Sequence, residues 1–190
     1  MISFDVETLG LESNAVVLSV GAIAFDLSDK ERDADLTVNE KYQKYLTNSC
    51  FVKFNTDNQV TVGRKVEKDA LEWWKKQAEI PIKRSLRRTD TDLPVRTGLE
   101  QLTQYCNGHK TFWQRGSLDQ MIIDNLCRQF NIPLLCNYWD WMDFRTALAL
   151  TKETAARGYC VIPEFDEYQV IKHDPVHDAA FDIIMLLYGE

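Results

Sequence analysis

The sequence predicts an α/β fold in which helices flank a mixed β-sheet. The first observation is a series of apolar segments of strand length in the N-terminal part. The clearest, Ala15–Phe25, is almost continuously apolar and rich in valine, which is typical of a strand buried on both faces. The second is that helical spacing of apolar residues takes over further along the chain and alternates with short strands. A chain of 190 residues, 45% of them apolar, is large enough for one core, and we expect a single domain over residues 1–190.

Three strands joined by short connections begin the chain and predict an antiparallel meander. They are Met1–Thr8, the valine-rich Ala15–Phe25 and the shorter Tyr42–Leu46. Between them, the charged segment Asp26–Asp35 is expected to form a turn, and the polar segment Asn55–Gly63 that follows is expected to form a loop.

Helices are expected to dominate the remainder of the chain. Their expected ranges are Glu67–Ala78, Val95–Cys106, Ser117–Phe130, Phe144–Leu150 and Pro175–Tyr188, with short strands at Thr111–Arg115 and Tyr138–Trp141. Ser117 to Gln120 has the pattern of a capping box, and Asp174 is a suitable N-cap for the last helix. The expected order, β-β-β-α-(α)-β-α-β-α-α, is that of a mixed sheet covered by helices.

Composition limits the classes of function. The net charge of −7 argues against a nonspecific nucleic-acid binder, but it does not exclude an enzyme that recruits its own cations. Basic residues cluster at Arg64–Lys68, Lys75–Lys76 and Lys83–Arg88, where a local patch would attract a phosphate backbone; solvated helix faces are the alternative. Five cysteines without a C-x-x-C pair are typical of reduced thiols.

We expect no membrane span and no secretory signal, since the sequence contains no apolar stretch of the required length and starts directly on a strand. The expected location is the cytoplasm, or the host cytoplasm if the protein is encoded by a phage.

The first strand ends in the pattern Asp5-Val6-Glu7, which carries the first chemical signal. Residues two apart in a strand point to the same side, so the two carboxylates are expected to project together. Their repulsion is relieved either by water at an exposed strand end or by a divalent cation, which prefers oxygen ligands.

Two further acids occur at the starts of helices. Asp119 follows a strand and a glycine, and Asp178 lies on a final helix that is apolar nearly all round. Such a helix is normally buried, and a buried carboxylate needs a partner. Each acid also has a simple structural explanation, because acids near a helix N-terminus interact favourably with the helix dipole.

Three motifs in this order resemble those of the DEDDh 3′→5′ exonucleases. They are Phe4-Asp5-Val6-Glu7-Thr8-Leu9-Gly10, Arg115-Gly116-Ser117-Leu118-Asp119 and His173-Asp174-Pro175-Val176-His177-Asp178-Ala179. More narrowly, the chain resembles the bacteriophage exonuclease A proteins and related bacterial exonucleases grouped with a mycobacterial exoribonuclease. That likeness includes Leu71-Glu72-Trp73-Trp74-Lys75 and Asp143-Phe144-Arg145-Thr146 and covers almost the whole length.

The resemblance implies a ribonuclease-H-like fold: a mixed five-stranded sheet, with three antiparallel strands then two parallel ones, flanked by helices. It further implies that Asp5, Glu7, Asp119 and Asp178 bind two Mg²⁺ or Mn²⁺ ions and that His173 is the general base. Two such ions activate water and stabilise both the attacking and the leaving oxygen of a phosphodiester, and four carboxylates without a soft ligand suit them.

Substrate contacts are expected from four residues. The family uses the loop containing Thr8 and Leu9 against the terminal nucleotide, and Arg115 and Arg145 are expected to contact phosphate. For Arg145, as for Asp143, a structural ion pair is an equal alternative. Trp73 is a candidate for stacking on a nucleobase, whereas Trp74 is expected to pack in the core.

Two assignments have rivals in the sequence. His177 and Asp182 repeat the spacing of His173 and Asp178, but both lie inside the predicted helix and point about 140° apart. His173 precedes the helix and can reach over the site, so we assign the pair His173/Asp178. Asp124 is a rival of Asp119 but does not directly follow the strand and glycine.

The predicted function is a metal-dependent 3′→5′ exonuclease that releases nucleoside 5′-monophosphates from 3′ ends. DNA is the favoured substrate and RNA is the alternative. A catalytically inactive nucleic-acid-binding domain and an enzyme acting on a short oligoribonucleotide are further alternatives.

Overall fold

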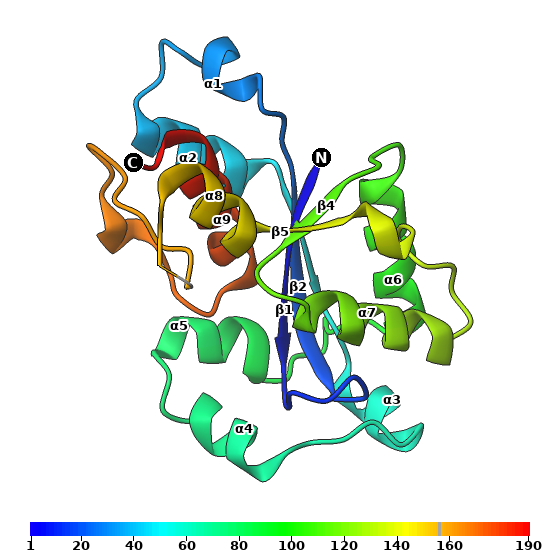
Figure 1. Ribbon diagram of the computed structural model, residues 1–190. Coiled ribbons are helices and arrows are strands. Elements are labelled where there is room, and N and C mark those ends of the chain that lie inside the picture. The colour runs from blue at the N-terminus through cyan, green and yellow to red at the C-terminus, as the bar shows by residue number, and fades with distance from the viewer. Residues whose placement is uncertain (156) are drawn as a thin grey trace.

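A mixed five-stranded sheet forms the centre of the molecule, in the order β3-β2-β1-β4-β5 (Figure 1). The protein is described by a computed structural model that covers residues 1–155 and 157–190. The strands are β1 (Ile2–Thr8), β2 (Val17–Ala24), β3 (Ser49–Lys53), β4 (Phe112–Gln114) and β5 (Trp141–Asp143). Pairs β1–β2 and β2–β3 are antiparallel, whereas β1–β4 and β4–β5 are parallel. The expected ribonuclease-H-like arrangement of three antiparallel strands followed by two parallel ones is confirmed.

Helices cover both faces of this sheet, with α6 and α7 on one side and α2, α8 and α9 on the other (Figure 1). The helices are α1 (Asp29–Arg32), α2 (Val38–Thr47), α3 (Thr56–Thr61), α4 (Lys68–Trp74), α5 (Glu79–Pro81), α6 (Val95–Cys106), α7 (Leu118–Gln129), α8 (Phe144–Lys152) and α9 (Pro175–Tyr188). A π-helical turn (Ile82–Leu86) follows α5, and short 3-10 turns lie at Tyr138–Asp140 and Glu167–Gln169. Among the described helices, none combines the length and apolar character needed to cross a bilayer.

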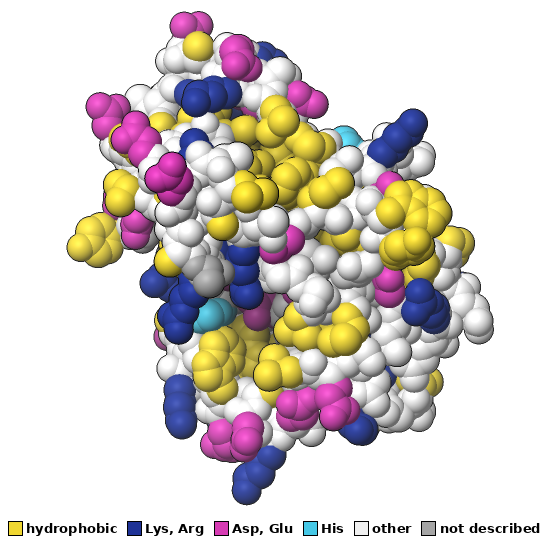
Figure 2. Space-filling view, in the orientation of Figure 1, with side chains coloured by type: hydrophobic (Ala, Val, Ile, Leu, Met, Phe, Trp, Pro, Cys, Tyr) yellow, Lys and Arg dark blue, Asp and Glu magenta, His cyan; other side chains and the backbone are white. Residues whose placement is uncertain are grey.

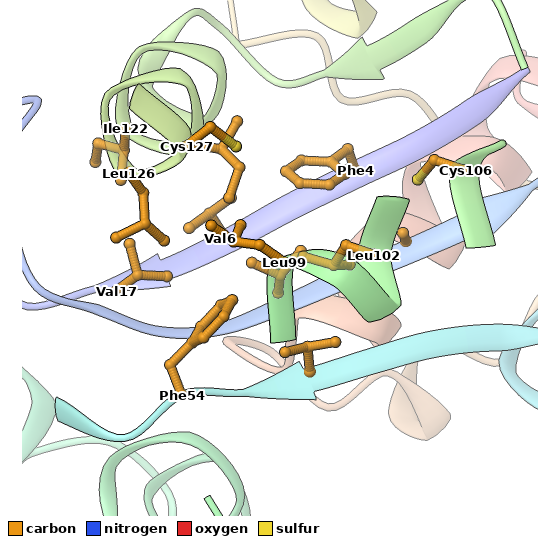
Figure 3. Packing of buried hydrophobic residues seen from close by; sticks show 14 of the residues in the cluster. Phe4, Val6, Val17, Phe54, Leu99, Leu102, Cys106, Ile122, Leu126 and Cys127 are labelled. Atoms are coloured by element: carbon orange, nitrogen blue, oxygen red, sulfur yellow. The ribbon is translucent and has the colours of Figure 1, made fainter. Parts of the chain in front are cut away.

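The central strand β1 alternates between the two layers. Ile2, Phe4 and Val6 point into one hydrophobic core, where they meet Leu99 of α6 and Leu126 of α7 (Figure 3). The residues between them therefore face the opposite layer, which contains α9.

One predicted strand is wrong. Tyr42–Leu46 belongs to α2, and the third strand, β3, comes directly after that helix. Thr37 and Glu40 form a capping box at the helix start, and the inward-facing Tyr42 and Tyr45 are three residues apart, as one side of a helix requires.

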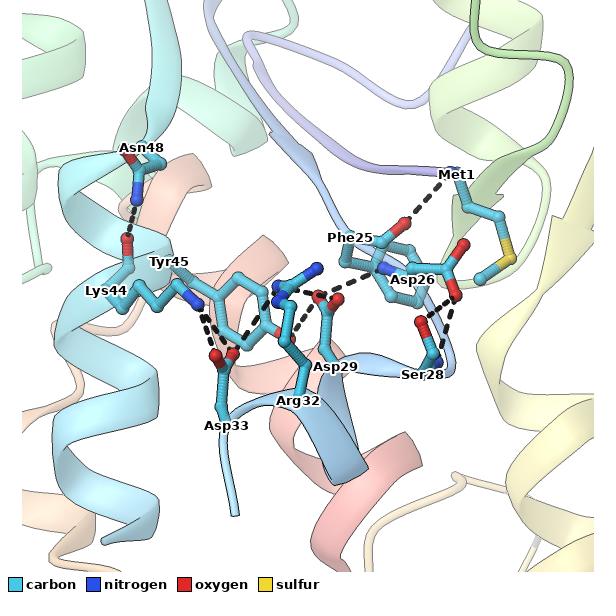
Figure 4. A network of polar contacts seen from close by, with 10 residues as sticks. All are labelled: Met1, Phe25, Asp26, Ser28, Asp29, Arg32, Asp33, Lys44, Tyr45 and Asn48. Atoms are coloured by element: carbon cyan, nitrogen blue, oxygen red, sulfur yellow. Dashed lines mark hydrogen bonds and ion pairs between the residues drawn. The ribbon is translucent and has the colours of Figure 1, made fainter. Parts of the chain in front are cut away.

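The charged segment after β2 is a turn that contains the short helix α1, and ion pairs and hydrogen bonds fasten it to α2 (Figure 4). Lys44 Nζ lies 2.6 Å from Asp33 Oδ1, and the Tyr45 hydroxyl donates to Asp29 Oδ2 at 2.9 Å. Arg32 also pairs with Asp29 at 2.7 Å. These contacts join the segment that contains α1 to α2, which packs in the same layer as α9.

Three further local expectations need correction. The predicted loop Asn55–Gly63 contains α3, which Asn55 caps, because its side-chain oxygen accepts from two backbone N–H groups. The helix predicted to end at Ala78 already ends at Trp74. The segment Tyr138–Trp141 is mostly a 3-10 turn, and β5 begins only at Trp141.

The predicted capping box before α7 is also wrong. Ser117 is the N-cap residue but makes no side-chain capping bond. Instead, the backbone N–H of Gln120 donates to Gln114 Oε1 at 2.7 Å, so the end of β4 supplies the cap. The strand and the helix that follows it are thus joined by a side chain that sequence spacing does not reveal.

Candidate active site

Strand β1 presents two acids to the layer that contains α9. In the antiparallel register Asp5 lies opposite Gly21 and Glu7 opposite Ser19. On the same face, the Ser3 hydroxyl donates to the Ala179 carbonyl of α9 at 2.9 Å. This buried bond joins the strand to the helix, and the two carboxylates therefore project toward the start of α9.

A glycine in the neighbouring strand lets that helix approach closely. A Cβ atom on Gly21 would lie only 2.3 Å from the Pro175 carbonyl carbon and 2.6 Å from the Val176 nitrogen. Asp174 begins the helix as predicted, and its carboxylate accepts from the N–H groups of Val176 and His177. The N-terminus of α9 thus packs directly on the sheet backbone, and Asp178 reaches the β1 acids from its first turn.

The fourth acid comes from the other layer. Asp119 lies in the first turn of α7, just after β4, which runs parallel to β1. In the turn between β4 and α7, Gly116 adopts φ +88°, a conformation that favours glycine. Its N–H donates to Asp143 Oδ1 at 2.9 Å. Asp143 also caps α8 through the N–H groups of Arg145 and Thr146. Hydrogen bonds to Asp143 therefore join the turn at Gly116 to the start of α8.

The four acids of β1, α7 and α9 line a cleft of about 730 Å³. Most of the predicted site residues are in it: Asp5, Glu7, Arg115, Asp119, Arg145, His173 and Asp178. Thr8 and Leu9 lie just beyond its edge; Leu9 is buried, and the Thr8 hydroxyl donates to the Gly10 carbonyl at 2.6 Å. Figure 2 shows Lys and Arg side chains, a histidine and acids gathered where this face of the molecule is hollowed.

The pKa values of the four carboxyl groups in the cleft are raised. Burial, followed by repulsion from neighbouring carboxylates, raises the pKa of Asp5 and of Glu7 well above their usual values. Burial is also the main reason that the pKa of Asp119 rises to about 8 and that of Asp178 to about 7. Such a cluster is stable in its ionised form only beside compensating positive charge.

The arrangement of ligand atoms fits a metal site. One ligand atom from each of Glu7, His173 and Asp178 lies within 4.8 Å of the others. Asp5 and Asp119 add oxygen donors in the same cleft. Carboxylate oxygens are the ligands that Mg²⁺ and Mn²⁺ prefer, so the four carboxylates fit these ions, and a ring nitrogen of His173 lies beside them.

His173 adopts an unusual backbone conformation directly before α9. Its φ of +63° is strained for a residue with a side chain, while its N–H donates to Asp178 Oδ2 at 2.9 Å. The ring packs edge-to-face against Trp73, with centroids 4.7 Å apart. Burial and then the charge of Lys172 lower the pKa of His173, which favours a neutral imidazole able to accept a proton.

The rival residues occupy other positions. His177 is buried, and its Nδ1 lies 2.7 Å from the Tyr42 hydroxyl and 3.3 Å from the Ile171 nitrogen that donates to it. Asp124 does not appear among the residues lining the cleft. Asp182 does line it, one helical turn after Asp178, and there it forms an ion pair with Arg115.

Arg115 has several partners within the protein. Its Nε donates to Asp182 Oδ1 at 2.9 Å, its Nη1 donates to the carbonyls of Arg157 and Gly158, and its guanidinium lies over the Tyr159 ring. This arginine therefore joins α9 to the segment that borders the cleft. Arg145, by contrast, is exposed, and its charge works against the rise in the pKa of Asp119.

Several residues of the basic clusters noted in the sequence are buried or form ion pairs. Arg64 is 3% exposed and bonds to backbone and amide oxygens, including the Ala15 carbonyl. Ion pairs engage Lys75 with Glu72, Arg84 with Asp174 and Arg88 with Asp57. Positive charge around the cleft comes instead from Arg115, Arg145 and Lys172.

Sequence reasoning missed three features of this site. Gly21 had a visible signal, since a glycine interrupts an otherwise bulky buried strand and often marks a close approach. No signal in the sequence indicates the other two features, the contact of Trp73 with His173 and the pairing of Asp182 with Arg115. Each joins residues at least 67 positions apart.

Comparison with known proteins relates the chain to exonucleases. The model of a family described as the 3′-5′ exoribonuclease Rv2179c-like domain matches residues 1–187. The chain is also similar to a protein of Enterobacteria phage T4 named exodeoxyribonuclease, with 27% identity over 209 residues, 97% of this chain and 86% of that protein. The fold, the acidic cleft and these similarities identify the protein as a 3′→5′ exonuclease, a hydrolase acting on nucleic acid. It belongs to the Rv2179c-like 3′-5′ exoribonuclease domain family.

Proposed function

We propose that the protein is a DEDDh-type exonuclease in which Asp5, Glu7, Asp119 and Asp178 hold two Mg²⁺ or Mn²⁺ ions. The observation that supports this most directly is the convergence of four carboxylates on one cleft, from the central strand and both helical layers. Asp119 is buried and the other three are partly buried, and the pKa of each is raised. An inactive binding domain would gain nothing from such a costly cluster.

When bound, the ions activate water and stabilise charge on the attacking and leaving oxygens of the phosphodiester. The carboxylates hold the ions and orient them. Arg145, exposed at the cleft, is available to contact a substrate phosphate. Arg115, already bound to Asp182, acts mainly through the segment that it holds in place.

His173 is the proposed general base. Its neutral imidazole removes a proton from the attacking water as the new P–O bond forms, and the bond to the 3′ oxygen breaks. The departing 3′ oxygen takes up a proton, and the terminal nucleoside 5′-monophosphate leaves. Placement of His173 by its bond to Asp178 supports this role.

DNA is the proposed substrate, and the similarity to the phage exodeoxyribonuclease over nearly the full chain supports it. RNA is the second candidate, because the matching family is described as an exoribonuclease domain. We propose the cytoplasm, or the host cytoplasm for a phage-encoded protein, as the place where the enzyme meets its substrate.

The decisive experiment incubates 5′-labelled and 3′-labelled DNA and RNA of the same sequence with the protein and Mg²⁺, with and without EDTA. We expect 3′-labelled DNA to release a labelled mononucleotide at once and 5′-labelled DNA to shorten gradually, with no reaction in EDTA. Early release of mononucleotide from the 5′ label, or cleavage in EDTA, would contradict the mechanism. Faster cleavage of RNA would transfer the proposal to RNA.

A further inference from the structure

Trp73 contacts the proposed general base from a different element of the fold. It lies on α4, is 43% exposed, and packs edge-to-face on the His173 ring, at a centroid distance of 4.7 Å and an interplanar angle of 80°. Trp73 belongs to none of the hydrophobic clusters of the described residues, so core packing does not account for it. The ring-to-ring contact across 100 positions of sequence instead suggests a role at the cleft.

The helix that carries Trp73 is itself anchored to the end of the catalytic strand. The adjacent Trp74 is 1% exposed and donates its indole N–H to the Thr8 carbonyl at 2.9 Å. Directly before the helix, the Glu67 backbone N–H donates to the Leu9 carbonyl at 2.8 Å, and Glu67 Oε1 accepts from the Leu11 N–H at 3.0 Å. Hydrogen bonds therefore join the helix α4 and its start to the chain that immediately follows Glu7.

The histidine, in contrast, has few constraints of its own. It lies on the connection before α9, in a left-handed conformation, and its backbone N–H is held by Asp178. That bond orients the peptide but leaves the side-chain torsions free. Of the aromatic contacts in the described part of the chain, the one with Trp73 is the only one made by the His173 ring.

We propose that Trp73 is a positioning residue that holds the His173 imidazole over the cleft, and that α4 thereby links the end of β1 to the proposed base. The inference rests on the proposed role of His173. It differs from base stacking, because Trp73 acts here through the histidine and not through the nucleic acid.

Kinetics separate these two roles. Removing the indole should lower kcat by about tenfold to a hundredfold with KM little changed, because a misplaced base slows chemistry without weakening binding. Trp73→Phe keeps an aromatic face and should restore most of kcat, whereas Trp73→Leu should not. Trp139→Ala is the matched control, since that tryptophan is 60% exposed and its aromatic contact is with the neighbouring Tyr138, not with His173; its kinetics should equal those of the unmodified enzyme.

A double-mutant cycle makes the test sharper. In the His173→Ala background, Trp73→Ala should cause no further loss of kcat, because the group through which Trp73 acts is already absent. A rise in KM with unchanged kcat in both backgrounds would overturn the proposal in favour of stacking on the substrate. If His173→Ala alone retains full kcat, the proposed general base is wrong, and that failure is distinct from failure of the Trp73 contact.

A spectroscopic measurement tests the contact without turnover. The chain has only three histidines, so their imidazole C–H signals can be assigned by single substitution in a ¹H–¹³C spectrum of the full-length protein in EDTA. Trp73→Ala should shift and broaden the His173 signals, through loss of the indole ring current and of its restraint, and should leave those of His109 unchanged. Unmoved His173 signals in a folded variant would overturn the proposal.

Discussion

Gly21→Ala is expected to damage catalysis although residue 21 carries no chemical group. The new Cβ would lie 2.3 Å from the Pro175 carbonyl carbon, whereas ordinary contacts begin at 3.4 Å. The atoms it meets belong to the backbone at the start of α9 and cannot rotate away. The helix must therefore retreat from the sheet by about 1 Å, and Asp178 must move with it.

Two magnitudes follow from this displacement. Overpacking of this kind costs about 1–3 kcal/mol of stability, and for a chain of this size each kcal/mol lowers Tm by about 2–4 °C. Moving a site residue by about 1 Å costs about a hundredfold in rate. We expect Gly21→Ala to show both effects when thermal unfolding and single-turnover cleavage of a 3′-labelled oligonucleotide are measured on the same preparation.

Gly108→Ala is the matched control. Gly108 has φ +87° and no atom near the position of a new Cβ, so alanine there causes backbone strain of about 1–2 kcal/mol without displacing a helix. Its Tm should fall while cleavage stays normal. Normal cleavage by Gly21→Ala, with a stability loss no larger than that of Gly108→Ala, would refute the close-approach argument.

Three further predictions concern the acids and histidines. Asp5→Ala should abolish cleavage, because it removes a proposed metal ligand. It should leave the protein folded, because it removes one of several mutually repelling carboxylates; an unfolded variant by circular dichroism would contradict this. His173→Ala should lower kcat by about 10²–10⁴-fold. His177→Ala should keep most of kcat and instead lose about 1–3 kcal/mol of stability, because the Tyr42 hydroxyl loses its buried partner. A larger loss of kcat in His177→Ala than in His173→Ala would assign the general base to His177. In EDTA, the raised pKa of Asp119, about 8, means that the folded protein binds a proton that the unfolded chain releases above about pH 4. This stabilising contribution is complete below about pH 4 and is lost as the pH rises toward 8, so Tm should fall over that interval. Asp119→Asn should make this fall of Tm with pH less steep, and Mg²⁺ should restore the Tm of the unmodified protein at pH 8. An equally steep fall in Asp119→Asn would contradict the assignment of the raised pKa to Asp119.

Local patterns were reliable where one signal dominated. The valine-rich second strand, the alternation of β1 and the apolar last helix with its Asp174 cap all appear in the structure as expected. The prediction of a strand at Tyr42–Leu46 is wrong because five residues with aromatic and polar positions fit a strand and a helix equally well. The capping box of Thr37 and Glu40, just upstream, was the signal that decides for the helix.

The order of residues along the chain specifies which groups are available for chemistry: the paired acids of β1, the acids at two helix starts and a histidine before the last helix. These depend on local order along the chain, which alternation, caps and motifs record. Which of these groups meet depends on how distant elements pack in the fold. Gly21 matters because a helix 154 positions later lies on it, and Trp73 because its ring reaches His173. Such contacts follow from the packing of distant elements, and their spacing in the sequence carries no period from which to infer them.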